Sequence, residues 1–374
     1  MKMGALLIRA DANRRIGAGH VMRCLALAQA WQSFGGDAIF AVHHCPTSLK
    51  NRIHQNGLEV LEINADSATQ QDAILLCKAA QQLHIDWIVT DGEHFGTAYQ
   101  TLLKRAGVKI LSITDNGSPR QQVADVVLNQ NMGATRALYP HCGPHTRFLL
   151  GTRFTLLRRE FAAWRNWTRM TAKDPHNVLI TMGGGDPENL TQQVTHALVH
   201  ARIPGLNVAV VAGLDHSVPE EPQIAGHCRV RVLREVNDMP RLMAWADVAV
   251  IAAGGTLWEL LYMQTPVISY TVKDVQDRPV RDLDKRGVIC NLGRSPVREQ
   301  ILCEVLTQLL EDKRRRERMG ILGRTLVDGE GPRRVVEILR QWPEVMSDSR
   351  DSSAQQGEYA ERTAGRSTGI HATG

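Results

Sequence analysis

The sequence has few of the features that identify several large classes of protein. Aromatic residues make up only 5% of the 374 residues. No apolar run approaches the roughly 18 residues that a membrane-spanning helix requires. The seven cysteines contain no C-x-x-C pair and no zinc-binding spacing, which indicates reduced core thiols. The opening MKMGALLIRAD reaches charged residues too early for a signal peptide, so we expect a cytoplasmic protein without a membrane span.

Excess charge of one sign is also small. The formal net charge of +5 is modest for this length, and the arginines are scattered along the chain. Such a balance suits a small anionic ligand, whereas nucleic-acid-binding proteins gather basic residues on one face, so we expect no nucleic-acid partner. A content of 43% hydrophobic and 22% charged residues is typical of a globular protein, and the length predicts two domains.

The first half of the sequence alternates strand-like and helix-like segments. Apolar strand patterns are separated by helical patterns and occur at residues 5–11, 37–43, 58–63, 86–91 and 109–115. This alternation predicts βαβ units and a parallel sheet with helices on both faces. The rhythm stops within residues 139–157, where prolines, glycines and basic residues gather, and we place the interdomain segment there. Residues 1–150 are therefore predicted to form the first domain.

The second half repeats the pattern. Strand patterns recur at residues 177–182, 207–213, 230–236, 248–252 and 266–272, with helical patterns between them. Residues 151–346 are predicted to form a second α/β domain. Two doubly wound, Rossmann-like domains that face a cleft would give an architecture like that of glycosyltransferase-B enzymes. From Ser347 onward apolar periodicity is missing, which predicts a disordered tail over 347–374.

One histidine stands at a strand-to-helix turn. In RADANRRIGAGHVMRCLALAQAW, residues 9–31, His20 follows Gly17 and Gly19 and precedes a helical pattern. Open α/β sheets bind ligands at this edge, the glycines let backbone approach a ligand, and a helix start offers amides to anions. The stretch is not a P-loop, because no Lys-Ser/Thr pair follows, and it is not a full dinucleotide fingerprint, because Met22 replaces the third glycine. His20 is a candidate general base, or else a capping or packing histidine.

Two glycine runs of the second half also follow apolar strands. They are TMGGGDPENLT at 181–191 and AAGGTLWELLYMQTPVI at 252–268. The first is either an ordinary βα turn or a loop that brings backbone to the cleft opposite His20. The second is a candidate cradle of backbone amides for a diphosphate that requires no metal. The candidate binding residues are Gly183, Gly184, Asp186, Asn189, Gly254, Gly255 and Thr256, with Thr256 a candidate helix cap. Glu259 is either an acceptor for a ribose diol or a partner of the helix dipole.

Carboxylates follow several predicted strands. Asp91 and Asp115 are expected at one sheet edge, where either can orient His20, or else each is a surface carboxylate. Asp11 ends the first strand and is a further candidate binding residue. The pair Asp282 and Asp284 alternates with basic residues, which is typical of a solvated helix face, so no metal site is predicted.

Taken together, four stretches resemble a known family. RADANRRIGAGHVMRCLALA, LLRREF at 156–161, VLITMGGGDPENLT and AAGGTLWELLYMQTPVI occur here in the order and spacing found in UDP-2,4-diacetamido-2,4,6-trideoxy-β-L-altropyranose hydrolases of pseudaminic acid biosynthesis. The resemblance extends over residues 5–270 and more weakly to 340. It implies a glycosyltransferase-B-like fold, UDP held mainly by the second domain, and no metal or other cofactor. It also implies a UDP-sugar and water as reactants, inversion, and His20 as the base that activates the water.

Three positions depart from the family pattern. Where members commonly have an aspartate followed shortly by a tyrosine, Asp91 is followed by Gly92-Glu93 and Phe95. Asn116 stands where a second acidic residue often follows, and Trp258 where some members have asparagine. An altered sugar, a glycosyltransferase with the same donor, and a non-catalytic UDP-sugar-binding protein therefore stay as alternatives. The sequence leaves the oligomeric state open.

Overall fold

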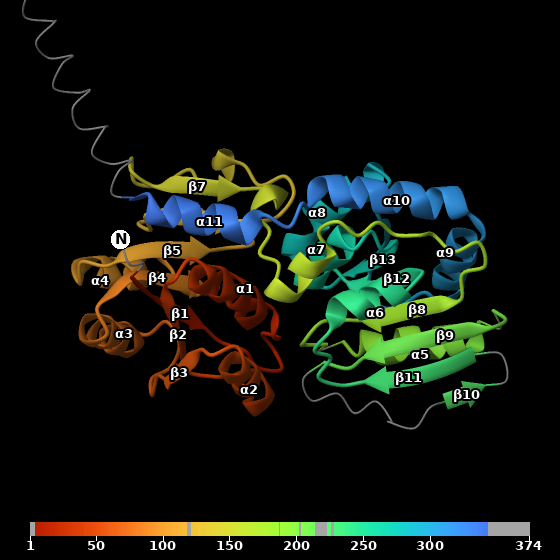
Figure 1. Cartoon of the computed structure of the whole chain (residues 1–374), viewed down its shortest axis with the longest axis horizontal. Helices are drawn as coiled ribbons and strands as arrows, with labels where there is room; N and C mark the ends of the chain where they lie inside the picture. The colour runs from red at the N-terminus through yellow and green to blue at the C-terminus, as the bar shows by residue number, and fades with distance from the viewer. Residues whose placement is uncertain are drawn as a thin grey trace, which may run out of the picture.

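The computed structural model describes residues 4–117, 121–186, 188–201, 203–213, 223–225 and 228–342. Its two lobes lie side by side, and each is built on a seven-stranded sheet (Figure 1). The predicted tail at 347–374 lies outside the described residues. In the described part of the chain, no helix is long and apolar enough to cross a membrane.

The first sheet is parallel throughout and has the strand order β3-β2-β1-β4-β5-β6-β7. Its strands are β1 Ala5–Ala10, β2 Asp37–Val42, β3 Glu59–Glu62, β4 Ile85–Asp91, β5 Lys109–Ile113, β6 Val126–Asn129 and β7 Arg147–Leu150. The helices between them are α1 Gly19–Ser33, α2 Thr47–Gln55, α3 Gln70–Gln82 and α4 Thr97–Arg105. The chain order reverses between β1 and β4, which makes the carboxyl ends of these two strands the expected place for a ligand.

The second sheet has the order β10-β11-β9-β8-β12-β13-β14, and only β10 runs antiparallel to its neighbour. The strands are β8 Asn177–Thr181, β9 Leu206–Val211, β10 Gln223–Ala225, β11 Cys228–Leu233, β12 Val248–Ala252, β13 Val267–Thr271 and β14 Cys290–Arg294. The helices are α5 Leu190–His200, α6 Met239–Trp245, α7 Gly255–Tyr262, α8 Asp274–Lys285, α9 Glu299–Glu311 and α10 Lys313–Leu326. Here the order reverses between β8 and β12, the two strands that precede the predicted glycine runs.

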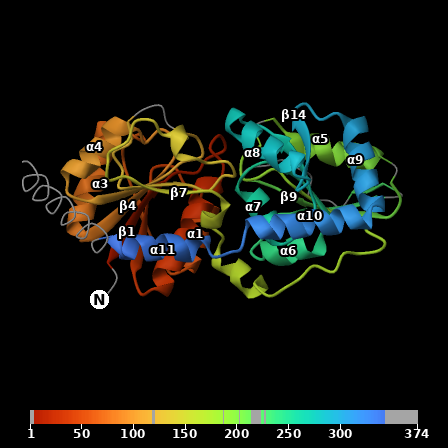
Figure 2. The ribbon, with the colours of Figure 1, turned by 90° about the horizontal axis from the view of Figure 1, so that it is seen from above.

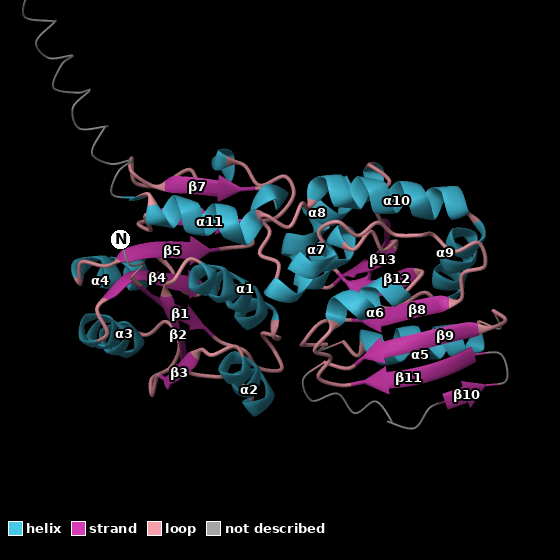
Figure 3. Cartoon of the chain, in the orientation of Figure 1, coloured by secondary structure: helices cyan, strands magenta, loops and turns pink. Residues whose placement is uncertain are grey.

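Helices cover both faces of each sheet, as Figure 3 shows, because alternate strand residues supply two apolar layers. In β1, Leu6, Ile8 and Ala10 face the layer that contains α1, while Leu7 faces the layer beneath α3 and α4. The second sheet has a corresponding pair of buried clusters. The predicted fold class, two doubly wound α/β units, is therefore confirmed.

The interdomain segment differs from the prediction. Residues 147–150, placed in the connection at 139–157, form β7 and complete the first sheet, and β6 was not predicted. Both strands are only four residues long and follow irregular chain, so their patterns are too short to identify. The chain crosses to the second sheet afterwards, through the 3-10 turns η2 Thr152–Phe154 and η3 Arg159–Trp164.

The last helix returns to the first lobe. Helix α11, Gly331–Arg340, lies against α1, and its Val335, Val336 and Leu339 join the buried cluster of the first sheet (Figure 2). Trp342 packs edge-on against Trp87 of β4, with ring centroids 5.6 Å apart. The predicted division, which assigned everything from 151 to 346 to the second domain, is therefore corrected for this helix. The apolar face of α11 packs on a surface of the first lobe, and the sequence of the helix alone does not show which lobe that surface belongs to.

Candidate active site between the two lobes

A cavity of about 880 Å³ lies between the two lobes. From the first lobe it is lined by residues 15–20, the helix residues Met22 and Arg23, the outer face of α2, Asp115, Gln130 and Asn131. From the second lobe it is lined by residues 181–186, 211–213, 234–237 and 252–259, and by the start of α8. The cavity therefore lies at the carboxyl ends of both sheets, at the points where their strand order reverses.

His20 is paired with a buried carboxylate. It lies in the first turn of α1, its side chain is 21% exposed, and it lines the cavity. Its Nδ1 lies 2.6 Å from Oδ1 of Asp91, the last residue of β4, whose side chain is fully buried. When Asp91 is ionised, Nδ1 carries the proton that it donates to the carboxylate, and Nε2 keeps a lone pair. This arrangement suits a general base.

Arg23, one helical turn after His20, keeps Asp91 ionised. Its Nε and Nη2 donate to the two carboxylate oxygens of Asp91, both at 2.6 Å. Burial alone would raise the pKa of Asp91, but the charge of Arg23 and then that of His20 hold this pKa well below its ordinary value. The thiol of Cys24 also donates to Asp91 Oδ2, at 3.3 Å. The carboxylate is thus a permanent anion behind the imidazole.

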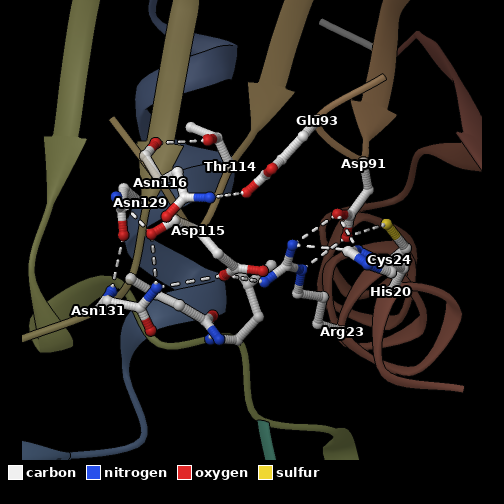
Figure 4. A network of polar contacts seen from close by, with 12 residues as sticks. His20, Arg23, Cys24, Asp91, Glu93, Thr114, Asp115, Asn116, Asn129 and Asn131 are labelled. Carbon is white, nitrogen blue, oxygen red and sulfur yellow. Dashed lines mark hydrogen bonds and ion pairs between the residues drawn. The ribbon is translucent and has the colours of Figure 1, made fainter. Parts of the chain in front are cut away.

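Asp115 joins the same network from the end of β5 (Figure 4). Arg23 Nη1 donates to its Oδ1 at 2.6 Å, and Asn131 Nδ2 donates to the same oxygen at 3.3 Å. Burial opposes ionisation here too, yet the Arg23 charge lowers the pKa of Asp115. The predicted approach of Asp91 and Asp115 at one sheet edge is confirmed, while Arg23, which links them, was not predicted. Its position three residues after His20 on a helix was the available signal.

The glycines of the first two loops bring the lobes together. A Cβ atom at Gly184 would lie 2.4 Å from Ala18 N, and one at Gly185 would lie 2.6 Å from Arg14 O. Gly17 has φ of +82°, and a Cβ there would lie 3.2 Å from Gly185 N. The backbone approach that these glycines permit is therefore between loop and loop, across the two lobes, at one end of the cavity.

The glycines before α7 instead face open space. No described atom lies within 4 Å of the position that a Cβ would take at Gly254 or Gly255, or at Gly19 and Gly183. Helix α7 begins after Gly254 with no side-chain cap from the described residues, so the predicted cap by Thr256 is wrong. Thr256 lies inside the helix and lines the cavity with both glycines. The start of α7 thus presents backbone amides to the cavity, as an anion site requires.

Glu259 and two arginines form a second charged group. Glu259 Oε1 accepts hydrogen bonds from Arg158 Nε at 3.2 Å and Nη2 at 2.8 Å. Arg158 also pairs with Glu160 at 2.7 Å, and Glu160 in turn accepts from Arg52 of α2 at 3.2 Å. Burial is the largest influence on the pKa of Arg158 and lowers it, but Glu259 and Glu160 raise it above its ordinary value. Glu259 lines the cavity, and its Oε2 accepts no hydrogen bond from a described residue.

Three predicted binding residues have contacts or backbone geometry that support the fold. Asp11 is buried away from the cavity, where it pairs with Arg9 at 2.8 Å and accepts the backbone N–H of His43 at 2.7 Å. Asn189 does not line the cavity, and its left-handed backbone, with φ of +52°, leads into α5. Asp186 lines the cavity but uses its carboxylate oxygens to accept the amides of Leu190 and Thr191, both at 2.8 Å.

The three departures from the family pattern lie in different surroundings. Phe95 is buried beneath the first sheet, with the guanidinium of Arg9 5.3 Å from its ring. Asn116 donates from its side-chain amide to Glu93. Trp258 is buried in the second core and also lines the cavity. Trp258 is therefore the one of the three departures that contributes to the cavity wall.

Comparison with known proteins gives relatives at low identity. The chain is 25% identical over 286 residues to the UDP-2,4-diacetamido-2,4,6-trideoxy-β-L-altropyranose hydrolase of Campylobacter jejuni, covering 75% of this chain and 97% of the hydrolase. It is 24% identical over 348 residues to the spore coat polysaccharide biosynthesis protein SpsG of Bacillus subtilis, covering 89% and 97% of the two chains. An uncharacterised protein of Methanocaldococcus jannaschii is 24% identical over 308 residues, and the match spans only 60% of that protein. No protein-family model matches the chain.

Solved structures show the fold. MurG of Acinetobacter baumannii superposes with a TM-score of 0.61 at 16% identity, over 91% of this chain and all of that chain. The spinosyn forosaminyltransferase SpnP superposes with a TM-score of 0.64 at 15% identity, over 92% and 99% of the two chains. The chain therefore has a glycosyltransferase-B-type fold. The resemblance to the hydrolase that the motifs indicated is confirmed by the match to the Campylobacter jejuni enzyme.

Proposed function

We propose that this protein is an enzyme that hydrolyses a UDP-sugar with inversion at the anomeric carbon. The observation that carries the proposal is the His20–Asp91 pair, 2.6 Å apart, on one wall of a cavity whose other wall holds the open N-terminus of α7. A base on one side and an anion site on the other are the two parts that such a reaction requires. The similarity to a UDP-sugar hydrolase and to a polysaccharide biosynthesis protein supports the substrate class.

The reaction follows from the roles of these groups. His20 Nε2 accepts a proton from water while Asp91 holds the imidazole through Nδ1, and the water oxygen attacks the anomeric carbon. The bond from that carbon to the diphosphate oxygen breaks with its electron pair on UDP. The amides at Gly255 and Thr256 stabilise the leaving diphosphate, and Glu259 Oε2 accepts from the ribose hydroxyls. Because backbone amides provide this stabilisation, the proposal needs no metal.

The direct test is to incubate the purified chain with UDP-sugars without any acceptor, beginning with a UDP-linked 2,4-diacetamido-2,4,6-trideoxyhexose. NMR of the fresh product should show free sugar with the inverted anomeric configuration, and EDTA should leave the rate unchanged. Turnover only with an added acceptor would indicate a glycosyltransferase. Binding without turnover would indicate a UDP-sugar-binding protein.

The second part of the test is His20→Ala. General base catalysis contributes roughly 100- to 10,000-fold, so kcat should fall by that factor while the Kd for UDP stays within about twofold of wild type. A variant that keeps most of the wild-type turnover would exclude His20 as the base.

A further inference from the structure

The guanidinium of Arg23 is held between two carboxylates of the protein. It lies on the face of α1 that carries His20, its side chain is 11% exposed, and its guanidinium stands between Asp91 and Asp115 (Figure 4). Three N–H groups are used on these carboxylates, each at 2.6 Å. Nη2 also lies 3.2 Å from His20 Nδ1. The arginine is thus held beside the imidazole of the proposed base.

The charges of the group are unequal. Two carboxylates face one guanidinium, which leaves one net negative charge next to the imidazole. This charge is balanced when the imidazole takes up a proton. The charge of Arg23 is already balanced by Asp91, so Asp115 adds a negative charge that this ion pair does not require. Asp115 is the more exposed carboxylate, at 30% against none for Asp91, so it is the member that can be changed with the least disturbance of the core.

We propose that Arg23 is a positioning residue which, together with Asp115, sets the charge around His20 and thereby the proton affinity of its imidazole. The forked contact of Arg23 with Asp91 fixes the carboxylate that orients the ring, and Asp115 offsets the positive charge that this contact brings close to the ring. The catalytic consequence rests on the proposed function, whereas the effect on proton affinity does not.

Further ionisable groups of the described part of the chain lie on the elements around the ring. Cys24 lies on the same helix, His94 follows β4, and Arg15 lies on the loop before α1. Across the cavity, the loop that contacts the first lobe is formed by glycines 183–185, and the nearby Asp186 carboxylate is bound by the amides that begin α5. The largest expected changes in proton affinity therefore come from Arg23, Asp91 and Asp115.

The test is the pH titration of the His20 imidazole by NMR in the full chain labelled at histidine, with the signal assigned from His20→Gln. Arg23→Met leaves two unbalanced carboxylates, which favour the imidazolium, so the titration midpoint should rise by about one pH unit or more. Asp115→Asn removes the balancing anion and leaves Arg23, so the midpoint should fall. Arg105→Met, at the exposed end of α4, removes the same charge elsewhere and should leave the midpoint unchanged.

Opposite shifts of the His20 titration midpoint in the two variants support the proposal. A loss of packing would not move the midpoint in opposite directions according to the sign of the charge that was removed. Midpoints that stay at the wild-type value in both folded variants would overturn it. If Arg23→Met does not fold, Asp115→Asn alone decides by the direction of its shift, and Arg23→Lys, which keeps the charge without the fork, should show a near wild-type midpoint with lower kcat. The two inferences can fail separately. If the His20 titration midpoint shifts as expected but the protein hydrolyses no UDP-sugar, the proposed function is refuted and this inference is not.

Discussion

At the scale of single residues, the side chains of this cavity divide into those that face it and those that hold the others in place. His20 and Glu259 face it, and each is bound through one side only, by Asp91 and by Arg158. The opposite side of each is left for a ligand. A binding role and a structural role for such residues can be separated by ligands that differ in a single group.

Glu259 can be tested in this way. If Oε2 accepts from the ribose, Glu259→Ala should weaken UDP binding by about 10- to 150-fold, the value of a charged hydrogen bond of roughly 1.5–3 kcal/mol, with a smaller effect on kcat at saturation. Glu259→Gln should be milder, since it keeps an acceptor. Calorimetry with UDP and with its 2′,3′-dideoxy analogue measures both. If the preference for the diol is unchanged in Glu259→Ala, the carboxylate serves only Arg158 and the helix dipole.

Asp11 gives a prediction for stability against pH. Burial alone would raise its pKa, but Arg9 and Ser67 lower it to about 2, below the ordinary value of 3.8. Because the folded pKa is the lower one, the stabilisation is fully present above about pH 4 and is lost as the pH falls through about 2, and it amounts to about 2 kcal/mol. The free energy of unfolding of the wild type should therefore fall more steeply over this interval than that of Asp11→Asn. Parallel curves would show that Asp11 does not contribute.

At the scale of elements, the position of α7 depends on the hydrogen bonds that the carbonyl groups at its C-terminal end accept. Arg169, in the connection between the lobes, donates to Met243 O at 2.7 Å and Ala246 O at 2.8 Å near the end of α6, and to Met263 O at 3.3 Å after α7. It also donates to Thr265 Oγ1 at 2.8 Å. Burial lowers the pKa of Arg169 to about 10, an effect that Asp247 partly offsets. One guanidinium thus joins the carbonyl ends of two helices whose other ends face the cavity.

Arg169→Ala should therefore lower the free energy of unfolding by about 2–4 kcal/mol, because several buried carbonyls lose their donor at once. Arg169→Lys should recover only part of this loss, since an ammonium cannot make the planar fork. Denaturant unfolding monitored by fluorescence measures the change, with Arg241→Ala, an exposed arginine on α6, as the matched control. If the two alanine variants have equal stability, the contacts of Arg169 are not stabilising.

At the scale of the whole molecule, contacts outside the cavity wall also join the lobes. The glycine loops at 17 and 184 contact each other directly, and the chain crosses back after α10 so that α11 packs on the first sheet. The relative position of His20 and the start of α7 depends on both connections.

Gly184→Ala tests the first connection. A Cβ atom 2.4 Å from the backbone nitrogen of Ala18 forces the two loops apart, and a displacement of about 1 Å at reacting groups can cost about 100-fold in rate. We expect kcat/KM for UDP-sugar hydrolysis to fall by about that factor, while the unfolding temperature changes little. Gly143→Ala, whose Cβ would meet only Thr146 Oγ1 at 3.6 Å, is the control. Full activity in Gly184→Ala would mean that the lobes tolerate separation at this point.

The sequence by itself determined the elements and the general place of the site. Apolar segments that end at or just before Asp11, Asp91, Gly183 and Gly254 are sufficient to predict strand ends, and parallel strands bring such ends to one edge whatever the details of packing. The fold class and the approach of Asp91 to Asp115 follow from the alternation of strand and helix patterns and from the parallel direction of the strands. Both can be predicted from local segments of the sequence.

Only the tertiary structure decided which of these groups touch each other. Arg23 reaches Asp91 and Asp115 over 68 and 92 residues of chain, and Arg158 reaches Glu259 over 101. Asp11 and Asn189 look like site residues in the sequence. In the structure, Asp11 accepts a hydrogen bond from the backbone of His43, and Asn189 adopts the left-handed backbone that leads into α5. Helix α11 belongs to the first lobe because its apolar face packs against α1, and Trp342, just after the helix, packs against Trp87, more than 240 residues earlier in the sequence. Contacts of this kind depend on the distance between surfaces that meet only after folding, and no local pattern encodes that distance.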